Sequence, residues 1–326
     1  MPLIDPPAYQ PPWGLRNPHF NTIYPNRFRK VTGVNYQRER ILTPDGDFLD
    51  LDWDRRGNDT LLLVVHGLEG NAHRYYIKGL LRAGFSKGWD GVGLNLRGCS
   101  GVPNQTYGSY HSGKSDDLHT ALLHILNKHQ YTNILIAGIS LGGNLVLKYA
   151  GERGAELHTK VRAVAGISVP TDLQGSALQL EVPGNRIYLY RFLRQLRKKV
   201  RQKAAQFPEA NLDFKALERA KNFREFDDLY TAPAHGFSSA ADYYERCSAN
   251  RFIGGIDRPA LLLNAQDDSF LSAGCYPKAQ AVDHPKFHFM MPRFGGHVGF
   301  MRGYRSANPS LQEVVVPEFF ERQLQV

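Results

Sequence analysis

Residues 138–142 read Gly-Ile-Ser-Leu-Gly, and this G-x-S-x-G spacing is typical of a serine held on a sharp turn between a strand and a helix. Glycines are needed two positions before and after the serine because larger side chains would collide across so tight a turn. An apolar run at 134–137 precedes the motif, and a helical pattern at 141–150 follows it. The pattern favours Ser140 as a nucleophile over the alternative, a serine that only caps the helix.

A serine hydroxyl becomes nucleophilic at neutral pH when a histidine accepts its proton, and an acid must orient that histidine. In sites built on this turn, the acid and then the histidine follow the serine along the chain, each after a late strand. His297 lies in a glycine-rich loop, 294–299, after an expected strand at 286–291. We therefore expect His297 to be the base, and the alternative is an ordinary surface-loop histidine.

Two adjacent aspartates, Asp267 and Asp268, follow the expected strand at 259–264. The turn could present either carboxylate to the histidine. Asp268 is the preferred acid because it stands at the fourth position of a small-x-x-Asp turn that begins at Ala265. Asp267 would then cap or brace the turn.

The negative charge that develops on an attacked carbonyl oxygen needs hydrogen-bond donors, which together form an oxyanion hole. The backbone N–H of Leu141, directly after the serine, is expected to be one donor. The second is expected from Leu68, in the loop 66–70 that reads His-Gly-Leu-Glu-Gly after a strand at 60–66. His66 itself is interpreted as structural, hydrogen-bonding beneath the site.

His119, His124 and His129 recur every five residues, which corresponds to about 140° around a helix. We therefore expect that they do not share a helix face and do not form a metal cluster. The serine mechanism requires no metal and no organic cofactor, so neither is expected.

The chain has 326 residues, a formal net charge of +9 and 42% hydrophobic residues, which excludes disordered and collagen-like proteins. Its longest apolar runs, such as 61–65, are far shorter than the roughly 20 residues of a membrane-spanning helix. The proline-rich first 14 residues do not resemble a secretory signal. With three scattered cysteines and no disulfide framework expected, a cytoplasmic location is predicted.

Eight of the basic residues lie between Arg186 and Lys203, where there is no acidic residue. Apolar residues recur there at helical spacing, so an amphipathic helix with one basic face is expected. The helix could cover part of the core or make peripheral contact with anionic lipid. No nucleic acid partner is expected, because no recognised nucleic-acid motif accompanies the charge.

The order of elements predicts an α/β fold with a doubly wound, mostly parallel sheet. A hairpin is expected at 40–54, and buried strands at 60–66, 90–96, 133–138, 161–167, 259–264 and 286–291. Helices are expected at 74–87, 114–128, 141–151, 216–223 and 310–324. The long interval before the strand at 259–264 predicts an inserted helical lid at 169–257, with the core formed by 1–168 and 258–326.

Once these residues are aligned, the chain resembles the α/β-hydrolase superfamily and, within it, the YheT-type esterases. The resemblance runs over nearly the whole chain and rests on the blocks 14–19, 44–47, 66–70, 96–101, 110–113, 138–142, 225–228, 242–244, 267–268 and 295–300.

The resemblance implies a serine hydrolase that acts on small-molecule carboxylic (acyl) esters. Acyl transfer to alcohols is one alternative. A non-catalytic protein that binds anionic lipid or nucleic acid through the basic helix is another. The aromatic residues Tyr188, Tyr190 and Phe192 would suit either an acyl pocket or ordinary packing of the lid.

Overall fold

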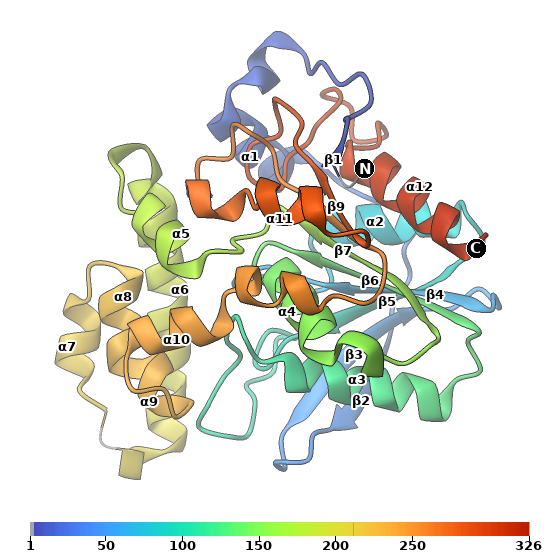
Figure 1. Ribbon diagram of the computed structural model, residues 1–326. Coiled ribbons are helices and arrows are strands. Elements are labelled where there is room, and N and C mark those ends of the chain that lie inside the picture. The colour runs from blue at the N-terminus through green and yellow to red at the C-terminus, as the bar shows by residue number, and fades with distance from the viewer. Residues whose placement is uncertain (1–2, 211, 326) are drawn as a thin grey trace.

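The computed structural model describes residues 3–210 and 212–325, and these contain one nine-stranded mixed sheet (Figure 1). The strand order is β1-β9-β8-β7-β6-β4-β5-β3-β2. Strand β3 pairs antiparallel with both of its neighbours, and all other pairings are parallel. The strands are β1 (Leu3–Ile4), β2 (Gln37–Leu42), β3 (Phe48–Asp54), β4 (Thr60–Val65), β5 (Asp90–Asn95), β6 (Asn133–Ile139), β7 (Val161–Ile167), β8 (Ala260–Leu263) and β9 (Phe287–Met290).

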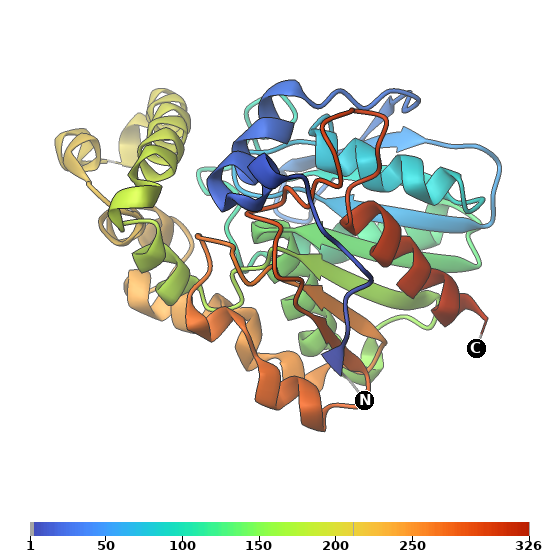
Figure 2. The same ribbon diagram turned by 90° about the horizontal axis from the view of Figure 1, so that it is seen from above.

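The central strands are mostly apolar, as expected of strands in a sheet that is covered on both faces. In β4, Leu61 and Leu63 pack into the core on one face, while Leu62 and Val64 pack into the core on the other. Helices α3 and α4 cover the first face, and α2 and α12 cover the second (Figures 1 and 2). These helices are α2 (Tyr75–Phe85), α3 (Ser115–Lys128), α4 (Leu141–Arg153) and α12 (Gln312–Leu324), and the short α11 (Lys278–Asp283) precedes β9.

The doubly wound α/β fold expected from the sequence is confirmed, with element ends that differ by a few residues. Among the elements that were not predicted are the two-residue edge strand β1, and α1 (Pro18–Phe28) with the 3₁₀ turn η1 (Trp13–Arg16) before it. Helix α1 lacks a continuous apolar stripe and contains Pro25, so its sequence has no strong helical periodicity.

Residues 169–257, which we call the helical insertion, contain helices and no strand among the residues described (Figure 1). They are α5 (Leu173–Gln179), α6 (Arg186–Gln206), α7 (Phe214–Arg219), α8 (Phe223–Phe226), α9 (Ala232–Ala234) and α10 (Ala240–Cys247), with the π-helical turn η5 (Asp227–Thr231) after α8. Leu189, Leu193 and Val200 of α6 pack in an apolar cluster that also contains Phe270 from outside the insertion. The division into a core and a separate lid remains a prediction.

The helix expected at 216–223 is wrong as a single element. Helix α7 ends at Arg219, and Asn222 begins α8 by accepting a hydrogen bond from the Glu225 N–H with its side chain (2.9 Å). Asparagine favours such a capping position over a helix interior, which explains the break.

Across residues 3–210 and 212–325, none of the helices combines the length and the apolar character needed to cross a bilayer.

Candidate active site

Ser140 occupies the junction between β6, which ends at Ile139, and α4, which begins at Leu141. Its backbone has φ 55° and ψ −121°, a conformation that costs energy for a residue with a side chain. The surroundings hold it there, because its N–H donates to the Ile167 carbonyl (2.8 Å) and its carbonyl accepts from the Asn144 N–H (3.0 Å). The turn therefore projects the hydroxyl beyond the end of the sheet.

The two glycines of the motif allow three backbone segments to approach one another. A Cβ atom on Gly138 would lie 2.2 Å from the Gly142 carbonyl oxygen. A Cβ atom on Gly142 would lie 2.5 Å from the carbonyl oxygens of Val65 and His66, at the end of β4. Any side chain at either position would push the turn off the sheet.

Ser140, His297 and Asp268 meet although they lie on three separate loops. The distance from His297 Nε2 to Ser140 Oγ is 2.9 Å, and that from His297 Nδ1 to Asp268 Oδ2 is 2.9 Å. The Asp268 side chain is fully buried and its Oδ1 also accepts from the Phe270 N–H (3.0 Å). The structure thus joins a hydroxyl, an imidazole and a carboxylate in one hydrogen-bonded chain.

Of the two candidate acids, Asp268 is the one that contacts His297. Asp267 Oδ1 instead accepts from the Gly296 N–H (2.9 Å), so its carboxyl braces the loop that carries His297. Burial raises the pKa of Asp267 to about 6. The neighbouring carboxylates therefore occupy different environments within one turn.

The loop of His297 is fixed from two directions. The His297 N–H donates to Thr22 Oγ1 in α1 (2.8 Å), and the Val298 N–H donates to Ser168 Oγ (2.9 Å). Gly296 has φ 54°, and a Cβ there would lie 2.4 Å from the Pro18 carbonyl oxygen. The N-terminal helix α1 thus positions the histidine.

This role of α1 was missed at the level of sequence. One local signal was available: Asn17 followed by Pro18 is the capping residue and first-turn proline with which a helix often begins. That signal could have located the helix, but no local pattern points from Thr22 to a residue 275 positions away.

Phe270 was also missed. Its ring stacks on His297, with ring centroids 4.2 Å apart and an angle of 19° between the planes. The hydrogen bonds to Ser140 and Asp268 hold the two ring nitrogens of the imidazole. The stacked Phe270 ring covers a face of the imidazole and so restricts its rotation.

The loop expected to contribute the oxyanion hole runs beside the serine, because a Cβ on Gly67 would lie 3.0 Å from Ser140 Cβ. Leu68 and Leu141 both line the cavity at Ser140 and His297. Their roles as backbone donors stay predictions.

His66, in the same loop, accepts from the Leu96 N–H at Nε2 (3.1 Å), while its Nδ1 lies 2.8 Å from the Gly67 carbonyl oxygen. Burial lowers the pKa of His66 to about 3, so the ring is neutral and structural, as expected.

The cavity above Ser140 is roofed by the helical insertion. Phe192 lines it, whereas Tyr190 is exposed and Tyr188 packs against Phe270. Most of its walls are apolar, and they include Leu173, Ala177, Leu180, Leu196, Val200, Phe223, Phe226 and Leu271. Such walls suit an apolar group of a ligand.

Polar side chains interrupt those walls, among them the ionisable Lys199 and Asp227. Lys199 of α6 forms an ion pair with Glu69 (2.8 Å), which follows Leu68 in the loop after β4. Asp227 accepts from Tyr244 Oη (2.7 Å) and Thr231 Oγ1 (2.5 Å), and burial raises its pKa to about 6. The cavity therefore has polar as well as apolar contacts to offer.

The expectation that His119, His124 and His129 stay apart is wrong for two of them. His124 and His129 have ring centroids 5.9 Å apart, and both approach Glu39. The expected angle of about 140° between successive histidines applies only within a helix. Helix α3 ends at Lys128, and His129 has extended backbone. His119 lies apart, with Nδ1 2.9 Å from the Tyr149 hydroxyl.

Comparison with known proteins agrees with this geometry. The chain matches the family described as "alpha/beta hydrolase fold" over residues 60–304, and it belongs to that family. A serine at a strand–turn–helix junction, with a histidine and an acid later in the chain, is the arrangement that this fold carries.

Two curated relatives cover most of the chain. "Putative esterase YheT" of Escherichia coli (strain K12) is 34% identical over 295 residues, which is 89% of this chain and 86% of that protein. "Phospholipase ABHD3" of Mus musculus is 29% identical over 302 residues, or 90% and 73% of the two chains. Among solved structures, the Pyrococcus furiosus esterase Pf2001 superposes with a TM-score of 0.59 at 14% identity, covering 98% of both chains, and thus shares the fold.

Proposed function

We propose that the protein is a serine hydrolase that cleaves carboxylic esters through an acyl-serine intermediate. The observation that carries this proposal is the continuous hydrogen-bonded chain from Ser140 Oγ through both ring nitrogens of His297 to Asp268. A base already within 2.9 Å of the hydroxyl satisfies the geometric requirement for activating the nucleophile.

In the first half-reaction, Ser140 Oγ attacks the ester carbonyl carbon while His297 Nε2 takes the hydroxyl proton. The backbone N–H groups of Leu68 and Leu141 stabilise the resulting oxyanion. The intermediate collapses, His297 returns the proton to the leaving alcohol, and the acyl group stays on Ser140. Water then repeats the sequence and releases the carboxylic acid, while Asp268 stabilises the imidazolium in both halves.

The substrate class that we propose is an ester with an apolar acyl chain, since apolar side chains of the helical insertion form most of the wall next to Ser140. The names of the relatives, an esterase and a phospholipase, support this class. A cytoplasmic location remains a prediction.

Replacement of Ser140 by alanine tests the proposal. Turnover of a p-nitrophenyl acyl ester should fall at least about a thousandfold, because loss of the nucleophile removes the acyl intermediate. Ser109→Ala is the matched control, since Ser109 lines the same cavity but its hydroxyl donates to the Tyr110 carbonyl (3.4 Å). Labelling by a fluorophosphonate probe should disappear in Ser140→Ala alone. If folded Ser140→Ala keeps more than about a tenth of the activity, the assignment of the nucleophile is wrong.

Acyl transfer to alcohols and non-catalytic binding, the two alternative functions, predict different experimental results. Added ethanol yields an ethyl ester if the acyl-enzyme transfers its acyl group to alcohols in competition with water. A protein without catalysis would not react with the fluorophosphonate and would show only salt-sensitive binding to anionic lipid or nucleic acid.

A further inference from the structure

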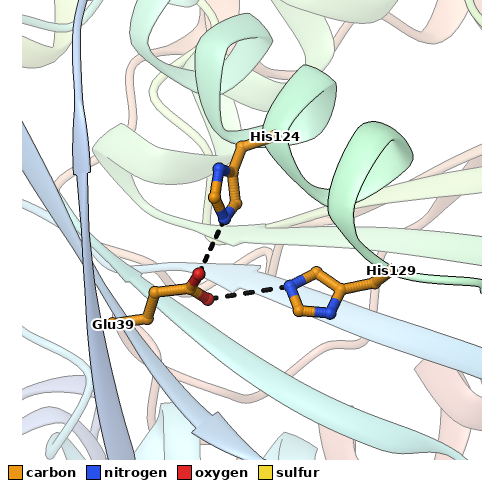
Figure 3. A group of neighbouring side chains, drawn as sticks. All are labelled: Glu39, His124 and His129. Atoms are coloured by element: carbon orange, nitrogen blue, oxygen red, sulfur yellow. Dashed lines mark hydrogen bonds and ion pairs between the residues drawn. The ribbon is translucent and has the colours of Figure 1, made fainter.

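Three side chains capable of binding a metal converge at the edge of the sheet, where β2 passes the end of α3 (Figure 3). Glu39 lies on β2, His124 on the last turns of α3, and His129 directly after that helix. The distance from His124 Nε2 to Glu39 Oε1 is 2.9 Å, and that from His129 Nε2 to Glu39 Oε2 is 3.6 Å. Their ligand atoms all lie within 4.8 Å of one another.

The backbone and a neighbouring ring fix this arrangement. The His129 N–H donates to the Ile125 carbonyl (3.0 Å), which closes α3, and the chain then becomes extended. The imidazole of His129 packs on Trp53, with ring centroids 4.6 Å apart.

We propose that Glu39, His124 and His129 bind one divalent transition-metal cation of the zinc type. Two imidazoles and one carboxylate are a ligand set that zinc accepts, with the fourth tetrahedral position left to water. Zn²⁺ bonds of about 2.0–2.2 Å place tetrahedral ligand atoms roughly 3.3 Å apart. The distances from Glu39 to the two histidines, 2.9 and 3.6 Å, bracket that value.

The guanidinium of Arg55 would compete with a bound cation for Glu39 and His129. One of its guanidinium nitrogens, Nη2, lies 3.3 Å from Glu39 Oε2 and 3.4 Å from His129 Nε2, and the guanidinium stacks over Trp53. It supplies positive charge to the carboxylate when no metal is bound. Its side chain is 39% exposed and can therefore turn into solvent when a cation takes its place.

The site lies outside the proposed catalytic apparatus. None of its three ligands lines the cavity at Ser140. A bound cation would tie the edge strand β2 to the end of α3, two elements far apart in sequence. Its effect is therefore expected on stability rather than on ester turnover.

Calorimetric titration of tag-free, EDTA-treated protein with Zn²⁺ tests the proposal. We expect one ion per chain with a Kd below about 10 µM. His124→Gln and His129→Gln should each weaken binding at least tenfold, while Arg55→Gln should strengthen it at least threefold. His119→Gln is the matched control, because it removes a histidine from α3 outside the cluster, and it should leave the affinity unchanged.

Absence of binding by the wild-type protein would overturn the proposal. So would equal affinities of the wild type, His124→Gln and His129→Gln, because the ion would then bind elsewhere, for example at His297. Far-UV circular dichroism verifies that each variant is folded, and Glu39→Gln replaces any histidine variant that is not. Anomalous X-ray scattering from a Zn²⁺-soaked crystal supplies a second measurement, since its peak must lie between Glu39, His124 and His129.

Discussion

Asp267 and Asp268 are adjacent carboxylates whose surroundings assign them different tasks. Asp268 faces His297 Nδ1, as an acid that orients the base must. Asp267 braces the backbone of the same loop through Gly296, and its Oδ2 is buried without a hydrogen-bond partner among the described residues. The side chain that acts on the imidazole is therefore Asp268 in the proposed mechanism.

Asparagine substitutions separate the two tasks. Asp268→Asn should lower kcat about 10³–10⁴-fold, because an amide can neither select the correct tautomer of His297 nor stabilise its cation. Asp267→Asn should keep kcat within about tenfold, because the amide oxygen still accepts from the Gly296 N–H. Initial rates with a p-nitrophenyl ester measure both, and a larger loss in Asp267→Asn would reverse the assignment.

At this scale the sequence singles out Ser140 and His297, because their glycine-rich surroundings are local. The structure brings the two side chains within hydrogen-bond distance, and their catalytic roles stay a proposal. Thr22 and Phe270 have no such local signal, since they position His297 through contacts that exist only in the folded chain. For His124 and His129 the sequence predicts a separation that the structure does not have. A helical angle does not hold for His129, which lies beyond the end of α3.

At the scale of elements, the turn that carries Ser140 is where β4, β6 and α4 meet. Gly142 is the contact point, because its Cα faces the carbonyl oxygens of Val65 and His66. A strained serine persists there only while these elements remain packed.

Gly142→Ala should destabilise the protein by about 2–3 kcal/mol, since the new methyl group would have to displace backbone atoms rather than a flexible side chain. Gly254→Ala is the matched control, because a Cβ there meets no atom within 4 Å. Urea unfolding measures both, and equal free energies of unfolding would show that the close approach is not required.

The helical insertion contains a buried acid that makes its stability depend on pH. Burial raises the pKa of Asp227 to about 6, above its value in an unfolded chain. Because the folded-state pKa is raised, protonation of Asp227 stabilises the folded protein. This stabilisation is complete below about pH 4 and is lost as the pH rises through about 6.

Asp227→Asn removes this titration. Between pH 4.5 and pH 7.5, the free energy of unfolding of the variant should rise relative to the wild type by about 2 kcal/mol. The lost contacts to Thr231 and Tyr244 add a constant offset, so the change with pH is the diagnostic quantity. Urea titrations at the two pH values measure it, and parallel pH profiles would contradict the burial argument.

Much of the element pattern is predictable from sequence, because the apolar runs of strands buried on both faces leave few alternatives. The edge strand β1 and helix α1 escape prediction because each is held by partners distant in sequence rather than by its own periodicity. The break between α7 and α8 depends on one capping asparagine within an otherwise helical pattern.

At the scale of the whole molecule, some basic side chains of α6 point into the protein and others point into solvent. Lys199 and Lys203 turn inward, the first to Glu69 and the second to the carbonyls of Asn104 and Thr106. Arg191, Arg194 and Lys198 are exposed. Ile187 and Tyr190 of the same helix are exposed as well. Basic and apolar groups together suit the interface of an anionic bilayer.

Vesicles of anionic phospholipid test that contact. We expect the protein to sediment with them at low salt and to be released as salt screens the charges. The triple variant Arg191→Gln/Arg194→Gln/Lys198→Gln should bind at least tenfold more weakly, since each basic residue near such a surface contributes about 1 kcal/mol. Turnover of a soluble ester should not change.

The control for this experiment neutralises three exposed lysines elsewhere, as Lys30→Gln/Lys128→Gln/Lys278→Gln. If both triple variants lose affinity equally, net charge rather than the surface of α6 governs binding.

The hydrogen bond between the His297 N–H and Thr22 joins positions 275 residues apart, so this contact to the loop of the proposed base forms only once the two ends of the chain have come together. Closing a loop of that length costs entropy that earlier, more local contacts must offset. A nascent or partly unfolded chain can carry a formed sheet and still lack a fixed histidine beside Ser140. In the proposed mechanism, such a chain would therefore lack the base that makes Ser140 reactive.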